Sequence, residues 1–587
     1  MKRSEVAKEL TWDLSDLVSS KDDFKSKYDE VLELNKSLKS LKGTIKDEKA
    51  IHNYTKELNQ LMEKFEVLSS YAEFCYCVDG NDEEAFKIVT EVDKLANEIT
   101  LTITDLENEL MSLDDDIISL AMENSEDAFV YLRSILKSKK RKLSDDVENA
   151  LVGFKDVWRA PNRLYDTIKA SDIRFPQFSA DGKEYPMTFG YFEERYESNK
   201  STELRRKAHE VFYNTMRNYQ STLAENYNTH LKIDKAMSKL RGFDSVFDYL
   251  LDKQDVTRES YERHVDAIKN ELPIVMRKYA KKIKEKYKLD KMTSADLKAP
   301  LFYEMEKEVS IDEAKDILKE GLAILGDDYV KETLKYINNR WIDFAENEGK
   351  ATGAFCADVH GVHSYVLISW TGAMEDAFVL AHELGHAGHG RYTMRNNSIL
   401  NSSSSLYTVE CPSTMNEMLL ANNFIKKAED EDMKNWVYSQ MIERTYYHNF
   451  VTHGIEAIFQ REVLRIIDKG DSVNASILNE LFGNILREFW GDEVEIIDGA
   501  ELTWTRQPHY FMGLYPFTYQ AGLSIATNVF LKIRQGDENI IGEYKEVLKS
   551  GGKYLPKEWA AHLGVDIEGD FISKTIDYIG ELVDSIK

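Results

Sequence analysis

The sequence contains few cysteines, prolines and glycines for its length. Its 587 residues include 4 Cys, 9 Pro and 29 Gly. Four cysteines in a chain this long do not make a disulfide framework. Because an all-β fold needs a turn about every ten residues, the scarcity of Gly and Pro argues against that class. It also argues against collagen-like and low-complexity architectures.

Positive charge is scarce relative to negative charge. The chain has 76 Lys and Arg against 103 Asp and Glu, which gives a formal net charge of −27. Nucleic-acid binding depends on clustered Lys and Arg that release counterions from phosphates, so we predict no nucleic-acid partner. The 42% hydrophobic residues allow a large core, and the charge therefore does not indicate disorder.

Long apolar runs are also missing. The stretch MKRSEVAKELTWDLSDL carries charges where a secretory signal peptide needs an apolar segment. No uncharged apolar run is long enough to span a bilayer. We therefore predict a cytoplasmic protein with no membrane partner, while the oligomeric state stays open.

Apolar residues at helical spacing are the main pattern that the sequence does contain. Residues 1–160 have no proline and three glycines, and their apolar positions recur every three or four residues. This pattern predicts a mainly α fold. Around Asp181-Gly182, β-branched and aromatic residues predict an edge hairpin. A second β signal is the alternating run SYVLISW, residues 364–370.

The stretch HELGH at residues 382–386 is an H-E-x-x-H motif. Residues four apart on a helix lie on the same face, so His382 and His386 could bind one metal ion. Glu383 would project about 100° around the helix and reach a metal-bound water. The alternative is a charged helix face whose histidines bind no metal and only form hydrogen bonds with neighbouring residues.

A helix is predicted around this motif. Met374, Phe378 and Ala381 recur at helical spacing, and no proline lies between Gly372 and Gly388. The two histidines would then face the same side of one rigid element.

A catalytic zinc ion usually takes three protein ligands, so a third ligand is needed. The extended motif H-E-x-x-H-x-x-G-x-x-H fails here, because its last Gly and His are replaced by His389 and Tyr392. A downstream glutamate is the other possibility. Glu410 is preferred because it precedes Pro412, which is well placed to start a helix. Glu417 would accept a hydrogen bond from a ligand imidazole, or be an ordinary solvated helix residue.

HELGHAGH followed by VECPSTMNE resembles the oligoendopeptidase F family, within the thimet-oligopeptidase group of zinc metallopeptidases. Other segments that resemble family landmarks, in the expected order, are TWDLSDL, ASDIRFPQF, YVLISW and HYFMGLYPFTYQAG. The resemblance covers nearly the whole chain. It implies a multi-lobed helical metallopeptidase with a small β-sheet beside the active-site helix and a deep substrate channel.

The resemblance also implies three domains and a metal centre. The domains are an N-terminal helical lobe (1–110), an oligopeptidase F-type N-terminal domain with the edge hairpin (111–190) and a catalytic zinc-peptidase domain (191–587). At the centre, His382, His386 and Glu410 match the ligands of one Zn²⁺ per chain, and Glu383 matches the general base that activates the zinc-bound water.

Donors to the substrate are implied in the C-terminal segment HYFMGLYPFTYQAG. By resemblance, His509 and one or more tyrosines donate hydrogen bonds that stabilise the transition state. We name Tyr515 and Tyr519 as candidates. Because Pro516 interrupts the family pattern, it stays open whether Tyr510, Tyr515 or Tyr519 faces the zinc.

These patterns together predict a zinc-dependent oligoendopeptidase that hydrolyses internal bonds of short peptides. An extended substrate could add to an exposed edge of the strand SYVLISW, or this strand could be a buried structural hairpin. One alternative function is a metallo-carboxypeptidase or dipeptidyl-type exopeptidase of similar fold. The other is a non-catalytic helical scaffold.

Overall fold

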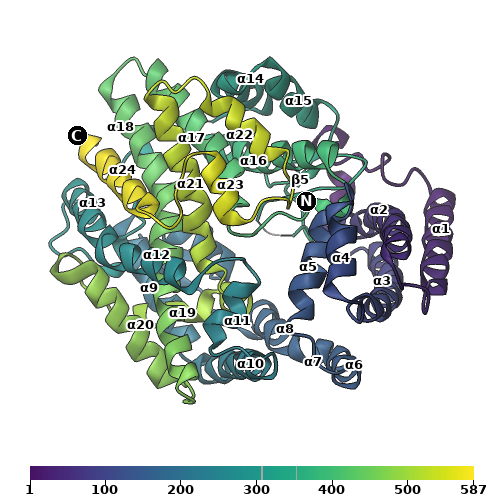
Figure 1. Ribbon diagram of the computed structural model, residues 1–587. Helices are drawn as coiled ribbons and strands as arrows, with labels where there is room; N and C mark the ends of the chain where they lie inside the picture. The colour runs from purple at the N-terminus through teal and green to yellow at the C-terminus, as the bar shows by residue number, and fades with distance from the viewer. Residues whose placement is uncertain (306–307, 352) are drawn as a thin grey trace.

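The structure is a computed structural model that describes residues 1–305, 308–351 and 353–587. Figure 1 shows a mainly helical molecule in which the N-terminal helices stand beside a larger body. This confirms the predicted fold class. The helices before residue 170 are α1 (Lys21–Ser40), α2 (Glu48–Val78), α3 (Glu83–Leu110), α4 (Asp115–Glu123), α5 (Phe129–Lys139), α6 (Asp145–Gly153), α7 (Lys155–Trp158) and α8 (Ala160–Thr167).

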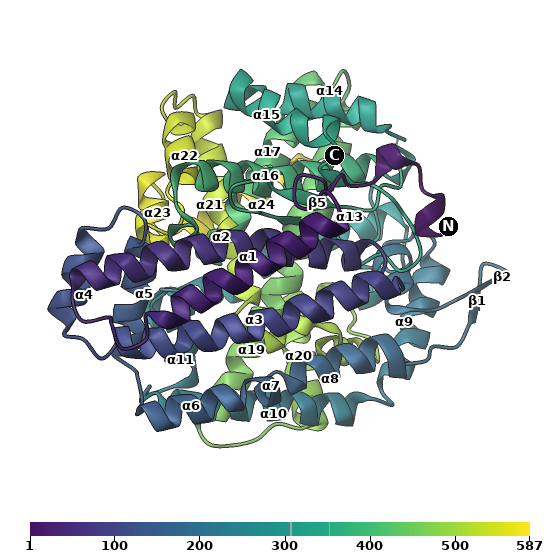
Figure 2. The ribbon, with the colours of Figure 1, turned by 90° about the vertical axis from the view of Figure 1, so that its right-hand side faces the viewer.

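Helices α1 to α5 form a lobe with its own hydrophobic core. Side-chain caps start the long helices: Ser20 accepts a hydrogen bond from the Asp23 N–H, and Asp47 accepts one from the Ala50 N–H. Figure 2 shows α1, α2 and α3 side by side across one face of the molecule. The buried residues of the lobe include Val31, Leu38, Ile51, Leu58, Leu61, Leu68, Val92, Leu95, Ile99 and, from α5, Leu132. The domain limits at 110 and 190 stay predictions.

The larger body contains the remaining long helices. None of the helices in the described ranges is long and apolar enough to cross a bilayer. The helices of this body are α9 (Thr202–Met216), α10 (Gln220–Leu240), α11 (Val246–Asp252), α12 (Arg258–Asn270), α13 (Leu272–Lys286), α14 (Ile311–Gly321), α15 (Asp327–Asn338), α16 (Met374–Asn396), α17 (Glu410–Lys427), α18 (Glu431–Gln440), α19 (His453–Asp468), α20 (Ala475–Trp490), α21 (Pro516–Arg534), α22 (Ile540–Leu548), α23 (Pro556–His562) and α24 (Phe571–Ser585).

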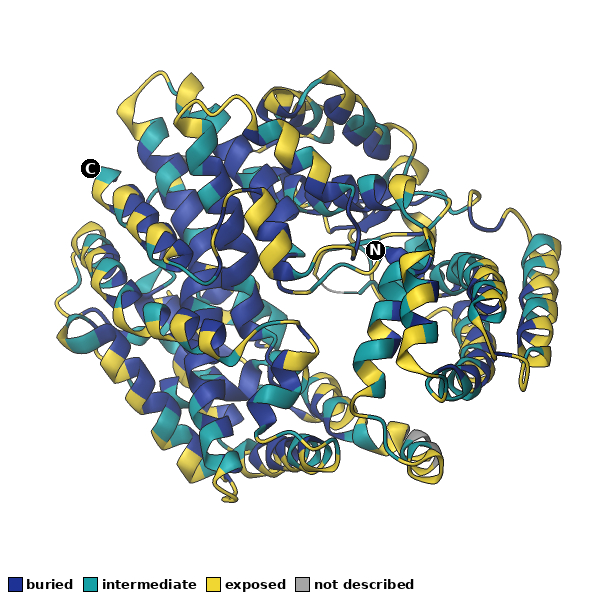
Figure 3. Cartoon of the chain, in the orientation of Figure 1, coloured by how far each residue is buried: buried dark blue, intermediate teal, exposed yellow. Residues whose placement is uncertain are grey.

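Helix α17 packs between α16 and α21, and the buried residues of these helices lie at the centre of the body (Figure 3). Glycines permit the close approach. A Cβ at Gly385 of α16 would lie 2.6 Å from the Cα of Ser413, and one at Gly522 of α21 would lie 2.8 Å from the Cβ of Glu410. The backbone around Glu410 is therefore held from both sides.

Helix α16 confirms the helix predicted around the motif, and it begins at Met374 and passes through Gly388. It continues to Asn396 and so carries the whole predicted motif. Gly388 lies inside the helix because a Cβ there would collide with the ring of Tyr329. This glycine therefore serves packing rather than termination.

Two small sheets complete the fold. Strands β1 (Phe178–Ala180) and β2 (Lys183–Tyr185) pair antiparallel, and both turn residues have positive φ, 50° at Asp181 and 72° at Gly182. Such angles at both central residues are those of a type I′ turn, which confirms the predicted hairpin.

The second sheet lies beside α16 and has the order β3 (Ile342–Asp343), β5 (Tyr365–Leu367), β4 (Phe355–Ala357). Strand β5 is buried and pairs on both sides, parallel with β3 and antiparallel with β4. The interpretation that an extended substrate adds to this strand is therefore wrong. A structural role, the alternative, fits its central place.

Candidate metal centre

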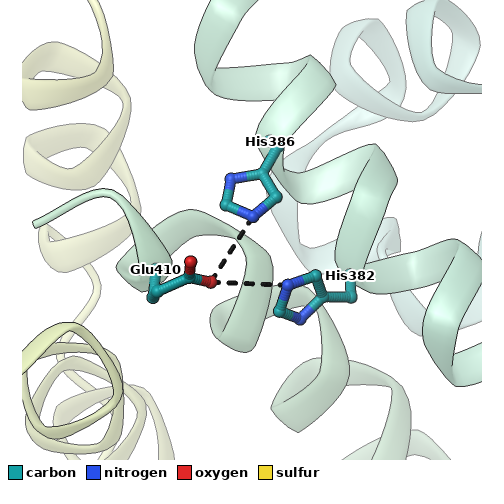
Figure 4. Close-up of side chains that lie close together, drawn as sticks. All are labelled: His382, His386 and Glu410. Carbon is teal, nitrogen blue, oxygen red and sulfur yellow. Dashed lines mark ion pairs between the residues drawn. The ribbon is translucent and has the colours of Figure 1, made fainter. Parts of the chain in front are cut away.

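Helices α16 and α17 bring three predicted ligands together. His382 and His386 lie one turn apart on α16, and Glu410 is the first residue of α17. Glu410 Oε2 is 3.4 Å from His382 Nε2 and 3.4 Å from His386 Nε2. Figure 4 shows both imidazole rings pointing at this carboxylate.

The spacing of these atoms fits a metal ion. Ligand atoms about 2.0–2.1 Å from a tetrahedral zinc ion are about 3.3–3.4 Å apart. Ser413 donates a hydrogen bond of 3.1 Å to Glu410 Oε2 and so orients the carboxylate. Burial alone would raise the pKa of Glu410, but hydrogen bonds from His382 and His386 hold that pKa well below its ordinary value. The donor set of two imidazoles and one carboxylate therefore suits Zn²⁺.

Glu417 lies two turns after Glu410 and contacts the other nitrogen of a ligand. Its Oε1 is 2.6 Å from His382 Nδ1, and its Oε2 accepts a hydrogen bond from Thr445. Thr445 belongs to the π-helix η9 (Met441–Thr452). A carboxylate at the second ring nitrogen fixes the tautomer and orientation of a ligand imidazole. The contact predicted for Glu417 is therefore present.

Glu383 lies between the two histidines in sequence and is only 6% exposed. Within the described residues, its Oε2 has no hydrogen-bond partner. Burial raises the pKa of this carboxyl, and the neighbouring Glu410 raises it further, whereas His382 and His386 lower it. A buried, unpartnered carboxylate oxygen beside the ligand set is available to accept a proton.

The C-terminal donors divide into two groups. His509, Tyr515 and Tyr519 lie together: the Tyr519 hydroxyl is 3.4 Å from His509 Nε2, and the two tyrosine rings are 5.2 Å apart. Burial raises the pKa of both tyrosines, and the charge of Glu410 contributes to both shifts, which places them near the ligand set. Tyr510 instead packs against Tyr227 in the core. The structure thus separates Tyr510 from the other two.

Three residues near these donors were not identified from the sequence. His453 Nδ1 is 2.7 Å from Glu456 Oε2, and His453 Nε2 is 3.1 Å from His448 Nε2. His509 Nδ1 lies 3.8 Å from the same Glu456 oxygen. The signal that could have found this cluster is the i, i+3 spacing of His453 and Glu456, which puts both side chains on one helix face.

One cavity adjoins this cluster, and a larger one lies between the two bodies of the molecule. One of about 350 Å³ is lined by His448, His453, Glu456 and His509, together with Arg506. The other, of about 1320 Å³, lies between the N-terminal lobe and the larger body. Its lining comes from α3, α5, α10 and α11, from residues 399–406 before α17, and from residues 552–556.

Known proteins resemble the chain over nearly its whole length. Oligopeptidase PepF of Bacillus subtilis is 27% identical over 571 residues, covering 96% of this chain and 85% of the relative. An oligoendopeptidase F homolog of Borreliella burgdorferi is 24% identical, covering 96% and 95%.

Solved structures share the fold. A Chlamydophila abortus chain described as a peptidase has a TM-score of 0.84 at 21% identity and covers 99% of both chains. Oligoendopeptidase-F of Enterococcus faecium has a TM-score of 0.75 at 20% identity, covering 96% of this chain and 98% of that one. Residues 109–175 match the family described as Oligopeptidase F. Because residues 195–570 match peptidase family M3, the chain belongs to that family of peptidases.

Proposed function

We propose that the chain is a zinc-dependent oligoendopeptidase that hydrolyses internal bonds of short peptides. The observation that carries the proposal is the position of Glu410 Oε2, equally distant from the two imidazole nitrogens of the H-E-x-x-H helix. His382, His386 and Glu410 would hold one zinc ion at this centre. Membership of peptidase family M3 supports the reaction class.

Glu383 is the general base of the proposed reaction. When bound, zinc supplies Lewis acidity that polarises the scissile carbonyl and lowers the pKa of water at the site to about 7. Glu383 would accept a proton from the attacking water at its unpartnered Oε2 and then deliver it to the leaving amine. Its burial keeps this proton from bulk water.

Tyr515, Tyr519 and His509 are the proposed donors to the substrate. Negative charge develops on the carbonyl oxygen in the transition state, and fixed hydrogen-bond donors stabilise it strongly where water is excluded. A tyrosine hydroxyl is protonated at neutral pH, and burial raises the pKa of both residues further. Both hydroxyls can therefore donate hydrogen bonds. The His509 contact with Tyr519 limits the rotation of that hydroxyl.

The preference for short peptides rests on the shape of the molecule. The cavity of about 1320 Å³ lies between the two bodies, and its lining includes residues 399–406 of the segment that precedes Glu410 in the sequence. A peptide chain fits between two bodies more readily than a folded domain does. Relatives described as oligopeptidases and oligoendopeptidases support the same substrate class.

An internally quenched peptide blocked at both termini tests the proposal. The zinc-loaded chain should cleave it, and mass spectrometry of the products should place the cut at an internal bond. An exopeptidase would leave the blocked peptide intact but cleave its unblocked counterpart. A non-catalytic scaffold would cleave neither. Removal of zinc by a chelator should abolish cleavage, and added Zn²⁺ should restore it.

A further inference from the structure

A second set of two histidines and one glutamate repeats the ring geometry of the first. The rings of His382 and His386 are 5.0 Å apart with an interplanar angle of 76°. The rings of His453 and His509 are 4.9 Å apart at 70°. In each set a glutamate oxygen lies between the two imidazoles, and Glu456 takes this place in the second. In the part of the chain that the structure describes, these are the two clusters with metal-binding geometry.

The second set contains buried polar atoms without partners. Glu456 and His453 are each 1% exposed. Within the described residues, neither Glu456 Oε1 nor His509 Nδ1 has a hydrogen-bond partner. Leaving a buried polar atom unpaired is unfavourable, and more so when the group is charged. Glu456 Oε1 carries lone pairs, and so does His509 Nδ1 when the ring proton is on Nε2. One cation bound between the two atoms would then satisfy both.

The orientation of His453 is fixed from its other side. Its Nδ1 faces Glu456, and its Nε2 is 3.1 Å from His448 Nε2. Its ring also stacks on Tyr519, with 4.0 Å between centroids and 11° between planes. In metal sites the second ring nitrogen of a ligand histidine is usually held by such a partner. Glu417 has the corresponding place at His382.

Charge around the second set permits a cation. Arg506 and Lys298 line the same cavity, but both are paired with Glu197, and Arg506 also pairs with Glu193. The carboxylate of Glu456 is therefore the charge that faces the two imidazoles of its own set. The cavity of about 350 Å³ leaves room for water at the remaining coordination positions.

We propose that His453, Glu456 and His509 form a second binding site for a divalent cation of the zinc class. Two imidazoles and one carboxylate are the donor types that Zn²⁺ and Co²⁺ accept in proteins. His509 would bind through Nδ1, which leaves its Nε2 directed at the Tyr519 hydroxyl. The ligands of this second site differ from those of the first centre, although His509 is also a proposed donor to the substrate.

Metal stoichiometry of the full-length chain tests the second site. The chelator-stripped protein is dialysed against micromolar Zn²⁺, and bound zinc is measured by mass spectrometry. The wild-type chain should bind two ions per chain, and Glu456→Gln should bind one. His386→Ala should also keep one ion, since it breaks only the first centre. The matched control His209→Gln alters another buried histidine of the same cavity and should bind two.

The visible absorption of Co²⁺ reports the coordination of the ion that His386→Ala keeps at the second site. In His386→Ala, bound Co²⁺ should give visible d–d absorption, and the additional exchange Glu456→Gln should remove it. If Glu456→Gln does not fold, as judged by circular dichroism, His509→Asn replaces it as the variant of the second site. One bound ion in the wild type together with none in His386→Ala would overturn the second site and leave the peptidase proposal intact. Two ions in a folded Glu456→Gln chain would also overturn it.

Discussion

The two His/His/Glu clusters share ring geometry but differ in how their scaffold holds them. In the first, Glu410 Oε2 is 3.4 Å from each imidazole nitrogen. In the second, the corresponding distances from Glu456 Oε2 are 2.7 Å and 3.8 Å. Equal spacing matches the separation of ligands around a metal ion, whereas 2.7 Å is a hydrogen-bond distance.

The difference follows from the elements that carry the ligands. The first set lies on α16 and α17, whose backbones meet at Gly385. The second set combines α19 with His509, which lies in the short 3₁₀ segment Pro508–Phe511. A pre-formed centre binds without rearrangement, while the second must separate His453 from Glu456 to admit an ion. The first site should therefore bind zinc more tightly than the second.

Exchanging one glutamate in or beside each cluster gives the largest expected difference between the two, in kcat for one and in zinc content for the other. Glu383→Gln removes the base but no ligand, and loss of a general base lowers rates by about 10²–10⁴-fold. We expect such a fall in kcat with an unchanged zinc content. Glu456→Gln should instead lose one bound ion. Steady-state cleavage of the blocked peptide and bound zinc, measured on the same samples, check both.

The Glu383→Gln result can contradict the role of Glu383 as the general base. Unchanged hydrolysis by a folded, zinc-loaded Glu383→Gln chain would rule out Glu383 as the base. Glu348→Gln exchanges an exposed glutamate that is not a proposed ligand, serves as the control and should match the wild type.

Tyr515 and Tyr519 lie between the two clusters, and their hydroxyls give the next largest effect. Loss of one donor to a developing oxyanion typically lowers kcat by about 10²–10³-fold. Tyr515→Phe and Tyr519→Phe should each reduce kcat within this range and keep the zinc content. The stack of residue 519 on His453 needs only the ring, so phenylalanine preserves it.

Tyr510→Phe is the matched control for this pair. Its ring packs against Tyr227 in the core, away from the other two tyrosines. It should therefore leave kcat near the wild-type value. A kcat loss in Tyr510→Phe as large as in Tyr519→Phe would contradict the separation of these residues.

The first cluster could be predicted from the sequence because its information is local. Two ligands and the base lie within five residues of one helix, and Glu410 follows at a loop–helix junction. The second cluster depends on tertiary packing that brings residue 509 beside residues 453 and 456. The central place of β5 also depends on neighbours distant in sequence, so the local pattern left open whether this strand is an exposed edge or a buried structural element.

Glu417→Gln should weaken the first centre and leave the second unchanged. The carboxylate contacts His382 Nδ1 at 2.6 Å, and loss of such a partner typically lowers metal affinity about 10–100-fold. Competition with a chromophoric chelator measures the two affinities. Thr445→Val, which removes only the hydroxyl bound to Glu417, should have a smaller effect. Equal weakening of both sites would contradict the independence of the clusters.

The smallest expected effect is on the free energy of unfolding, when a glycine is exchanged in α16 beside the first cluster or in α19 beside the second. A Cβ at Gly385 would meet the backbone of α17, 2.6 Å from the Cα of Ser413, whereas a Cβ at Gly454 would lie 2.8 Å from the Cγ2 of Ile268. A side-chain methyl can move and a packed backbone cannot, so Gly385→Ala should lower the free energy of unfolding by about 1–3 kcal/mol. In Gly454→Ala the gain in helix propensity, about 0.5–1 kcal/mol, offsets much of the strain. Urea unfolding measures both. Equal losses would show that the contact of α16 with α17 is no more rigid than the surroundings of His453.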